Sequence, residues 1–272
     1  MKIATNIGNW NGYARAHEKV VDPKQFIREA RKAGCAGVEI SKLEDHFAAP
    51  QEALAFIHAE GLEIAAWQGN VTYNPFEPNI QQYRRSLEYA ASLGVKTVMT
   101  CGGFPITPRR NTYPFDYDMF ASSIGPMVDF AADLGMTIAY HPHRGCICET
   151  IRETEAIMER VQDLRLCVDI AHLAASGEDP VAFIHRFGDG IIYSHIKDYS
   201  WAKDSFMELG KGDGDNGKPL VRVAECIKAL TENGYDGWLT LELDRKWTAA
   251  LPTPVESTKE SIAFLKELPE SG

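Results

Sequence analysis

The sequence predicts a single (β/α)₈ barrel, the TIM-barrel fold, with residues 1–272 forming one domain. Short apolar runs alternate with longer amphipathic runs eight times, which is the order of a barrel built from strand–helix units. The length of 272 residues also suits this fold, which typically needs about 250 residues. An open doubly wound sheet usually carries a GxGxxG loop after its first strand, and the segment NIGNWNGY lacks that spacing.

The strands and helices follow in a regular order. Strands are expected at residues 2–8, 37–41, 62–68, 97–103, 137–143, 164–170, 191–198 and 238–244. Helices are expected at residues 23–33, 50–60, 77–93, 116–134, 150–161, 179–187, 219–232 and 254–267. A glycine ends several of these helices, as at Gly34 and Gly135, because glycine readily adopts the left-handed conformation found there. The longer loops 104–115 and 199–218 are expected at the C-terminal face of the barrel, where active sites are built.

The composition is that of an ordinary globular protein. Hydrophobic residues make up 44% and charged residues 24% of the chain, which excludes a disordered, collagen-like or coiled-coil protein. The net charge of −10 disfavours a nucleic-acid partner. No run of roughly 18 apolar residues predicts a membrane span, and the first residues lack the pattern of a signal peptide. We therefore expect a cytoplasmic protein without a membrane partner, whose six scattered cysteines are reduced thiols.

Residues that bind metals or transfer protons gather at the ends of the last four predicted strands. They are His141, His143 and Glu149; Asp169 and His172; His195, Lys197 and Asp198; and Glu242 and Asp244. Side chains two residues apart share a face of a strand, so these groups can converge at the barrel mouth. Buried charges are costly unless they are paired or metal-bound. A mixed set of Asp, Glu and His suits Mn²⁺, Mg²⁺, Co²⁺ or Zn²⁺, and the pattern predicts such a site.

Some of these residues also have a purely structural interpretation. Glu149 lies just before a helix expected near Thr150, where an acidic side chain is favoured by the helix dipole. Asp198 and Asp244 could cap helices or hold neighbouring loops. Trp67 lies at a strand end and could shape a sugar pocket, and packing in the core is the competing interpretation.

Five segments of the chain resemble the xylose isomerase-like TIM-barrel superfamily, which includes sugar-phosphate isomerases and epimerases, ketose 3-epimerases, inosose dehydratase and endonuclease IV. The segments are AYHPHRGCICET, LCVDIAHLAASGEDP, SHIKD, ELGKGDG and GYDGWLTLELD. The stretch SHIKD, followed by a glycine-rich loop and GYDGWL, is especially similar to the inosose dehydratase branch. The resemblance covers nearly the whole chain and implies the same barrel fold.

The resemblance also implies one divalent metal ion, with Mn²⁺ preferred and Mg²⁺, Co²⁺ or Zn²⁺ as alternatives. Its expected ligands are Glu149, Asp169, His195 and Glu242. His141 is the alternative to Glu149, because the ketose epimerases place a glutamate within strand five, where this chain has Tyr140 or His141.

Catalytic and substrate-binding residues are expected around this metal. The catalytic residues we expect are Glu149, Glu242, His172 and Lys197. The residues expected to contact the substrate are His141, His143, His172 and Trp67. If Glu149 comes from a loop, the paired glutamates that the epimerases use across the substrate are not reproduced.

These expectations describe an isomerase or epimerase that removes the proton next to the metal-bound carbonyl of a keto sugar or keto polyol. One alternative is a lyase with the same metal site, such as an inosose-type dehydratase or an enzyme that eliminates from 3-keto glycosides. A second alternative is a sugar-binding or partner subunit without catalysis. Endonuclease activity is disfavoured by the acidic charge. The expected partners are a small carbohydrate substrate and, from the resemblance, further copies of the chain in a homo-oligomer.

Overall fold

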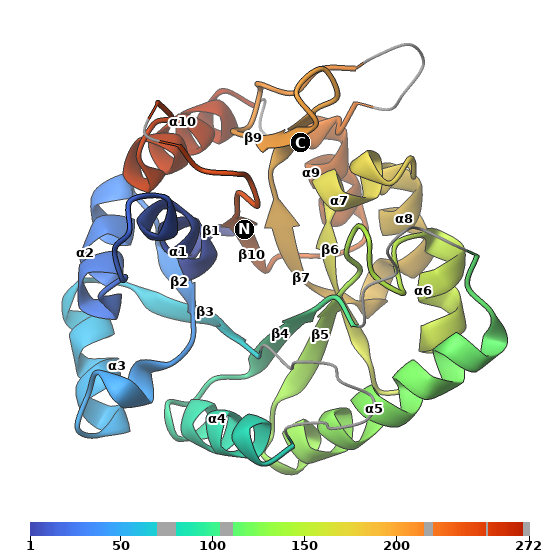
Figure 1. Ribbon diagram of the computed structural model, residues 1–272, viewed down its shortest axis with the longest axis horizontal. Helices are drawn as coiled ribbons and strands as arrows, with labels where there is room; N and C mark the ends of the chain where they lie inside the picture. The colour runs from blue at the N-terminus through green and yellow to red at the C-terminus, as the bar shows by residue number, and fades with distance from the viewer. Residues whose placement is uncertain (70–79, 104–110, 215–219, 249, 269–272) are drawn as a thin grey trace.

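The computed structural model describes residues 1–69, 80–103, 111–214, 220–248 and 250–268, in which eight parallel strands close into a barrel (Figure 1). Around the barrel the strand order is β1-β10-β7-β6-β5-β4-β3-β2. The strands are β1 (Lys2–Asn6), β2 (Gly37–Ile40), β3 (Glu63–Gln68), β4 (Thr97–Cys101), β5 (Thr137–His141), β6 (Arg165–Asp169), β7 (Ile191–Ile196) and β10 (Trp238–Leu241). The predicted (β/α)₈ barrel is confirmed.

Helices form a ring around this barrel (Figure 1). They are α1 (Ile7–Ala16), α2 (Pro23–Ala33), α3 (Pro50–Ala59), α4 (Ile80–Ser92), α5 (Pro114–Asp133), α6 (Ile151–Met158), α7 (Ile170–Ala175), α8 (Pro180–Phe187), α9 (Val223–Glu232) and α10 (Pro254–Glu267), with the short 3₁₀ turns η1 (Leu43–Asp45) and η2 (Gly188–Gly190). The last helix, α10, lies beside α2, so the end of the chain completes the ring (Figure 1).

Helix α2 shows how the local sequence sets the helix ends. The Asp22 side chain accepts a hydrogen bond from the backbone N–H of Lys24, and Pro23 occupies the first turn, where a missing N–H costs nothing. Gly34 ends the helix with φ of +101°. Between these ends, apolar residues such as Phe26 recur on one face and are buried against the barrel.

The inside of the barrel is filled by mostly small side chains. This inner cluster consists of Ala4, Ala65, Ala66, Met99, Ala139, Cys167 and Tyr193. Because side chains two residues apart share a face of a strand, the residues two positions further along the same strands point inward as well, one layer closer to the mouth. In β5, β6 and β7 those residues are His141, Asp169 and His195.

The structure departs from the sequence-based expectations in the segments that follow the strands. Strand β5 ends at His141 instead of residue 143, and β10 ends at Leu241 instead of residue 244. The helices α1 and α7 begin directly after β1 and β6, because the last residue of each strand, Asn6 or Asp169, caps the helix that follows.

An antiparallel hairpin, β8 (Asp198–Ser200) with β9 (Ser205–Met207), also lies in a segment expected to be a loop. The start of the predicted helix 77–93 and parts of the predicted loops 104–115 and 199–218 lie outside the described residues. In the part of the chain that the structure describes, no helix is both long and apolar enough to cross a membrane.

Candidate active site

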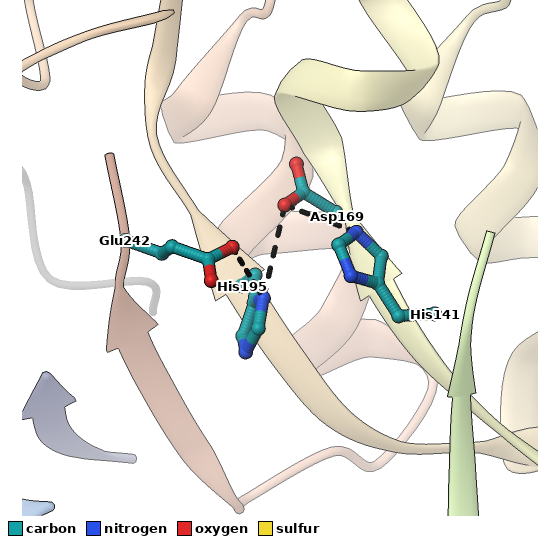
Figure 2. Close-up of side chains that lie close together, drawn as sticks. All are labelled: His141, Asp169, His195 and Glu242. Atoms are coloured by element: carbon teal, nitrogen blue, oxygen red, sulfur yellow. Dashed lines mark ion pairs between the residues drawn. The ribbon is translucent and has the colours of Figure 1, made fainter. Parts of the chain in front are cut away.

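Four side chains from neighbouring strands converge at the carboxyl end of the barrel (Figure 2). His141 ends β5, Asp169 ends β6, His195 lies on β7 and Glu242 directly follows β10. One nitrogen or oxygen atom from each lies within 4.8 Å of those from the other three. All four side chains are buried, and Glu242 is the most exposed of them at 6%. We call this set the inner group.

The backbone around the inner group fixes which atoms face inward. Asp169 Oδ1 accepts hydrogen bonds from the backbone N–H groups of Ala171 (3.0 Å) and His172 (2.9 Å) at the start of α7. Its second oxygen, Oδ2, is thereby left to face the inner group. Asp169 and His195 are register partners on β6 and β7, which places their side chains next to each other inside the barrel.

The inner group has the properties of a cation site. His195 Nδ1 lies 2.8 Å from Glu242 Oε2 and 3.9 Å from Asp169 Oδ2, and His141 Nε2 lies 3.3 Å from Asp169 Oδ2. Despite these short distances, neither ring nitrogen makes a hydrogen bond of good geometry with a described residue, and both are buried. Buried polar atoms normally have a partner, and a divalent cation would supply one to both nitrogens. Two imidazoles and two carboxylates suit Zn²⁺, Co²⁺ or Mn²⁺, so the residues fit a metal ion.

Lys197 adds a buried positive charge to this site. Its ammonium lies 2.5 Å from Asp169 Oδ2, 2.7 Å from Glu242 Oε2 and 3.3 Å from Asp244 Oδ2. Burial lowers the pKa of Lys197, but the three carboxylates outweigh burial and hold it well above the ordinary value. Burial raises the pKa of Asp169, but the charge of Lys197 and the nearby histidines outweigh burial and hold this pKa well below the ordinary value, so the carboxylate is ionised. Lys197 therefore contacts the same oxygen atoms of Asp169 and Glu242 that face the inner group.

A second set of side chains, the outer group, lies beside the first and nearer to solvent. It consists of His143, His172 and Asp244. His172 Nε2 lies 3.0 Å from Asp244 Oδ2, and the rings of His143 and His172 are 4.0 Å apart between centroids. The side chains of His143 and Asp244 are 30% and 39% exposed, whereas that of His172 is 2% exposed. Burial, with the neighbouring His143, lowers the pKa of His172 to about 3, so this ring is neutral.

Hydrogen bonds determine where the protons of the two outer histidines lie. His172 Nδ1 accepts from the backbone N–H of Arg144 (3.3 Å), so its proton is on Nε2 and is donated to Asp244. His143 Nδ1 lies 2.8 Å from the carbonyl oxygen of Arg144, and a carbonyl can only accept. The Nδ1 of His143 therefore carries a proton. Its Nε2 lies at the barrel mouth, 4.0 Å from Asp244 Oδ2, where in the neutral ring it has a lone pair without a hydrogen bond to any described residue.

The hairpin β8–β9 covers one side of the outer group. The ring of Phe206 lies 4.4 Å from that of His172, and the Lys197 ammonium lies 5.0 Å from the Phe206 ring centroid. The Arg144 guanidinium donates to Tyr199 Oη (2.8 Å) and to Asp204 Oδ1 (2.9 Å), which ties the loop after β5 to this hairpin.

The structure places two predicted site residues elsewhere. The Glu149 carboxylate accepts from the backbone N–H of Gly145 (2.8 Å) just before α6, and Glu149 is not a member of the inner group. His141, the stated alternative, occupies the strand-five position instead. Trp67 is fully buried, and its indole nitrogen donates to Ser86 of α4 (2.9 Å), so it faces the helix layer. Packing accounts for its position.

Glu39, on β2, lies outside the residue patterns that predicted the site. Its carboxylate is fully buried and lies 2.6 Å from His195 Nε2. The signal that could have identified it is an acidic residue within the short apolar strand GVEI, because an ionised side chain is rarely buried without a partner. Asp198, by contrast, accepts from the backbone N–H groups of Tyr199 and Gly210, as the structural interpretation expected.

The fold and the site together define a (β/α)₈-barrel protein with a candidate metal centre at the carboxyl ends of its strands. More specifically, the chain belongs to the xylose isomerase-like TIM barrel family, whose sequence model matches residues 27–268. It is 26% identical over 269 residues to an inosose dehydratase of Clostridium botulinum, covering 90% of this chain and 89% of that one.

Solved structures share the fold. The IolI protein with a bound zinc atom superimposes with a TM-score of 0.74 at 18% identity, covering 98% of both chains. The D-psicose 3-epimerase of Clostridium cellulolyticum H10 superimposes with a TM-score of 0.76 at 16% identity, covering 98% of this chain and 99% of the epimerase. These likenesses establish the common barrel.

Proposed function

We propose that this protein is a divalent-metal-dependent enzyme that removes the proton next to the carbonyl of a keto sugar or keto polyol. The observation that carries the proposal is the inner group, in which two buried ring nitrogens without hydrogen bonds face two carboxylates. The relatives named inosose dehydratase and the epimerase structure support a carbohydrate substrate.

The metal would be held by His141, Asp169, His195 and Glu242, with Mn²⁺, Zn²⁺, Co²⁺ and Mg²⁺ as the candidates. A divalent cation bound there supplies Lewis acidity, which polarises a carbonyl and makes the neighbouring C–H more acidic. The zinc atom in the IolI structure supports a divalent ion in this fold. Glu149 lies outside the inner group, and we assign it a structural role in its loop.

The outer group and Lys197 would handle protons and substrate hydroxyls. His143 offers the free Nε2 lone pair, so it is our candidate for the base that takes the proton. Burial and Asp244 raise the pKa of Glu242, but His195 and Lys197 lower it to about 2, which makes Glu242 a better ligand than base. The Lys197 ammonium has three N–H donors. The one nearest Asp244 can donate a hydrogen bond to a substrate oxygen that approaches there.

Removal of the same proton leads to different products. Its return to the other face gives epimerisation, its return to the neighbouring carbon gives isomerisation, and loss of a β-hydroxyl gives dehydration. Dehydration is the second candidate, because relatives covering most of the chain are named inosose dehydratase. A protonated Lys197 beside the outer group could assist departure of the hydroxyl.

The test combines metal analysis with proton exchange. The metal content of gently purified protein is measured for the wild type and Glu242→Gln. Inososes, free ketoses and 3-keto glycosides are then incubated with the protein in deuterated water and followed by NMR. Proton removal exchanges the hydrogen next to the carbonyl for deuterium even where no new product accumulates. We expect about one metal ion per chain, less in Glu242→Gln, and exchange in at least one substrate class.

A wild type that binds no divalent metal, even after reconstitution, would exclude the proposal and favour a sugar-binding subunit. A wild type that binds metal but neither exchanges nor converts any of these substrates would exclude the proposed substrate class and leave the metal site in place. Asp116→Asn is the control, since it changes a buried carboxylate at the start of α5, outside the inner and outer groups.

A further inference from the structure

A fully buried contact next to the candidate metal centre joins Glu39 to His195. Both side chains are completely buried, and Glu39 Oε2 lies 2.6 Å from His195 Nε2. The two residues come from β2 and β7, which are separated by β1 and β10 in the barrel, so the contact spans the interior. The other ring nitrogen, Nδ1, faces Glu242 and Asp169. His195 is therefore held between the Glu39 carboxylate on one side and the other members of the inner group on the other.

Asn6 fixes the Glu39 carboxylate from the opposite side. The Asn6 amide nitrogen donates to Glu39 Oε1 (2.5 Å). Asn6 Oδ1 accepts from the backbone N–H of Gly8 at the start of α1. A Cβ at position 8 would lie 2.5 Å from Asn6 Oδ1, so Gly8 leaves the space that this arrangement needs. The first strand, the first helix and β2 thus set the position of one carboxylate.

We infer that Glu39 is a positioning residue that keeps the His195 proton on Nε2 and leaves the Nδ1 lone pair for a metal ion. The inference rests on the proposed metal site and goes beyond it, because Glu39 is not a member of the inner group. A carboxylate that accepts from the second nitrogen of a ligating imidazole fixes the tautomer and the ring orientation and makes the ligand more basic.

The two neighbours of Glu39 explain why a carboxylate is required here. Both the Asn6 amide nitrogen and the His195 Nε2–H are donors, and a carboxylate accepts from both. A glutamine has one acceptor and one donor end, so in Glu39→Gln an N–H₂ group faces either Asn6 or His195. If it faces His195, the ring is driven to the tautomer with its proton on Nδ1, where the metal should bind.

The experiment measures metal affinity in the full-length protein. Zn²⁺ dissociation constants are determined by competition with a chromophoric chelator, and the visible absorption of bound Co²⁺ reports the ligand geometry. We expect Glu39→Gln to weaken Zn²⁺ binding by roughly 10- to 100-fold and to change the Co²⁺ spectrum. Asp116→Asn should leave both measurements unchanged. Asn6→Ser retains an oxygen for the Gly8 N–H, but its shorter side chain lacks the amide N–H₂ that donates to Glu39, and it should weaken binding by less.

The outcomes separate this inference from the proposed function. A wild type without Zn²⁺ or Co²⁺ binding overturns the metal site itself. A wild type that binds metal, with Glu39→Gln folded and unchanged in affinity and spectrum, overturns only the role of Glu39. If Glu39→Gln does not fold, Asn6→Ser decides: weaker Zn²⁺ binding supports the role, and unchanged binding overturns it.

Discussion

The inner and outer groups lie side by side at the barrel mouth, yet they are built differently. The inner group is buried, comes from strand ends and includes two ring nitrogens without hydrogen bonds among the described residues. The outer group comes largely from the segments after the strands, is linked internally by the His172–Asp244 hydrogen bond and is partly exposed. Strand ends therefore provide rigid, buried positions suited to an ion, whereas the segments beyond them reach the solvent from which a substrate arrives.

Metal affinity should change most at Asp169, which belongs to the inner group and also caps α7. In Asp169→Asn one side-chain oxygen can still accept from Ala171 and His172, so the helix stays capped. An amide nitrogen then replaces the oxygen that faces the inner group. Changes to residues that only hydrogen-bond a metal ligand typically weaken metal binding by at most about 100-fold. We expect Asp169→Asn to weaken it by more than this, and activity to disappear.

Asp179→Asn is a matched control, because Asp179 caps α8 in the same way and lies away from the site. Metal content and chelator competition measure both variants. An Asp169→Asn protein with the affinity of the wild type would remove Asp169 from the inner group.

The next effect separates the two groups directly. His143→Gln removes the lone pair of the proposed base but leaves all four inner side chains. We expect the turnover rate to fall by roughly 10²- to 10⁴-fold while metal affinity stays the same. Deuterium exchange kinetics and chelator competition measure the two quantities. His185→Gln on α8 is the exposed control. Parallel losses of metal affinity and rate in His143→Gln would contradict the division into two groups.

Lys197 connects the groups, and its removal should affect stability. Lys197→Met leaves Asp169, Glu242 and Asp244 without their shared counter-ion. Breaking a buried pair in this way typically costs about 3–5 kcal/mol, so we expect a loss of that order in the metal-free protein, measured by urea unfolding. Added metal should recover more stability in the variant than in the wild type, because it restores a positive charge.

Lys228→Met provides the comparison for this loss, since Lys228 forms an exposed ion pair with Glu232 and should contribute less than about 1 kcal/mol. Equal stabilities of the two variants would show that the buried ammonium is not needed to hold the carboxylates.

His141 and Glu149 are the two alternatives for the metal ligand that follows strand five, and substituting each of them decides between the two. Glu149→Gln should leave metal affinity unchanged, because the side chain accepts from Gly145 within its own loop. His141→Gln should weaken binding, because His141 supplies the strand-five nitrogen. The same chelator competition measures both. The opposite result would restore Glu149 as the ligand.

Much of this arrangement was accessible from the sequence. The alternation of strands and helices predicts the barrel, and the polar residues at the ends of strands five to eight predict a site there. The resemblance to the family then selects Asp169, His195 and Glu242 from this larger set. The strand-five position was open, because His141, His143 and Glu149 all fall in one short polar segment. Choosing among them depends on where the strand ends, and that depends on pairing with β4, which reaches His141.

The positions of Trp67 and Glu39 depend on contacts between distant strands, which the local sequence does not reveal. Trp67 was a candidate pocket residue, but the side of the strand that it faces depends on the register of β3 in the closed sheet. Glu39 is a single acidic residue in an apolar run, and its partner His195 lies far away in the chain. Only the closed barrel brings them together.

The candidate site residues are unevenly distributed along the chain. Every member of the inner and outer groups lies between β5 and the segment after β10, whereas the first four strands contribute Asn6 and Glu39. A chain cut between β4 and β5 would therefore yield one fragment with all the candidate ligands and one with none. The first half of the barrel would then act on the candidate metal centre only through the contact of Glu39 with His195, and through Asn6, which holds Glu39.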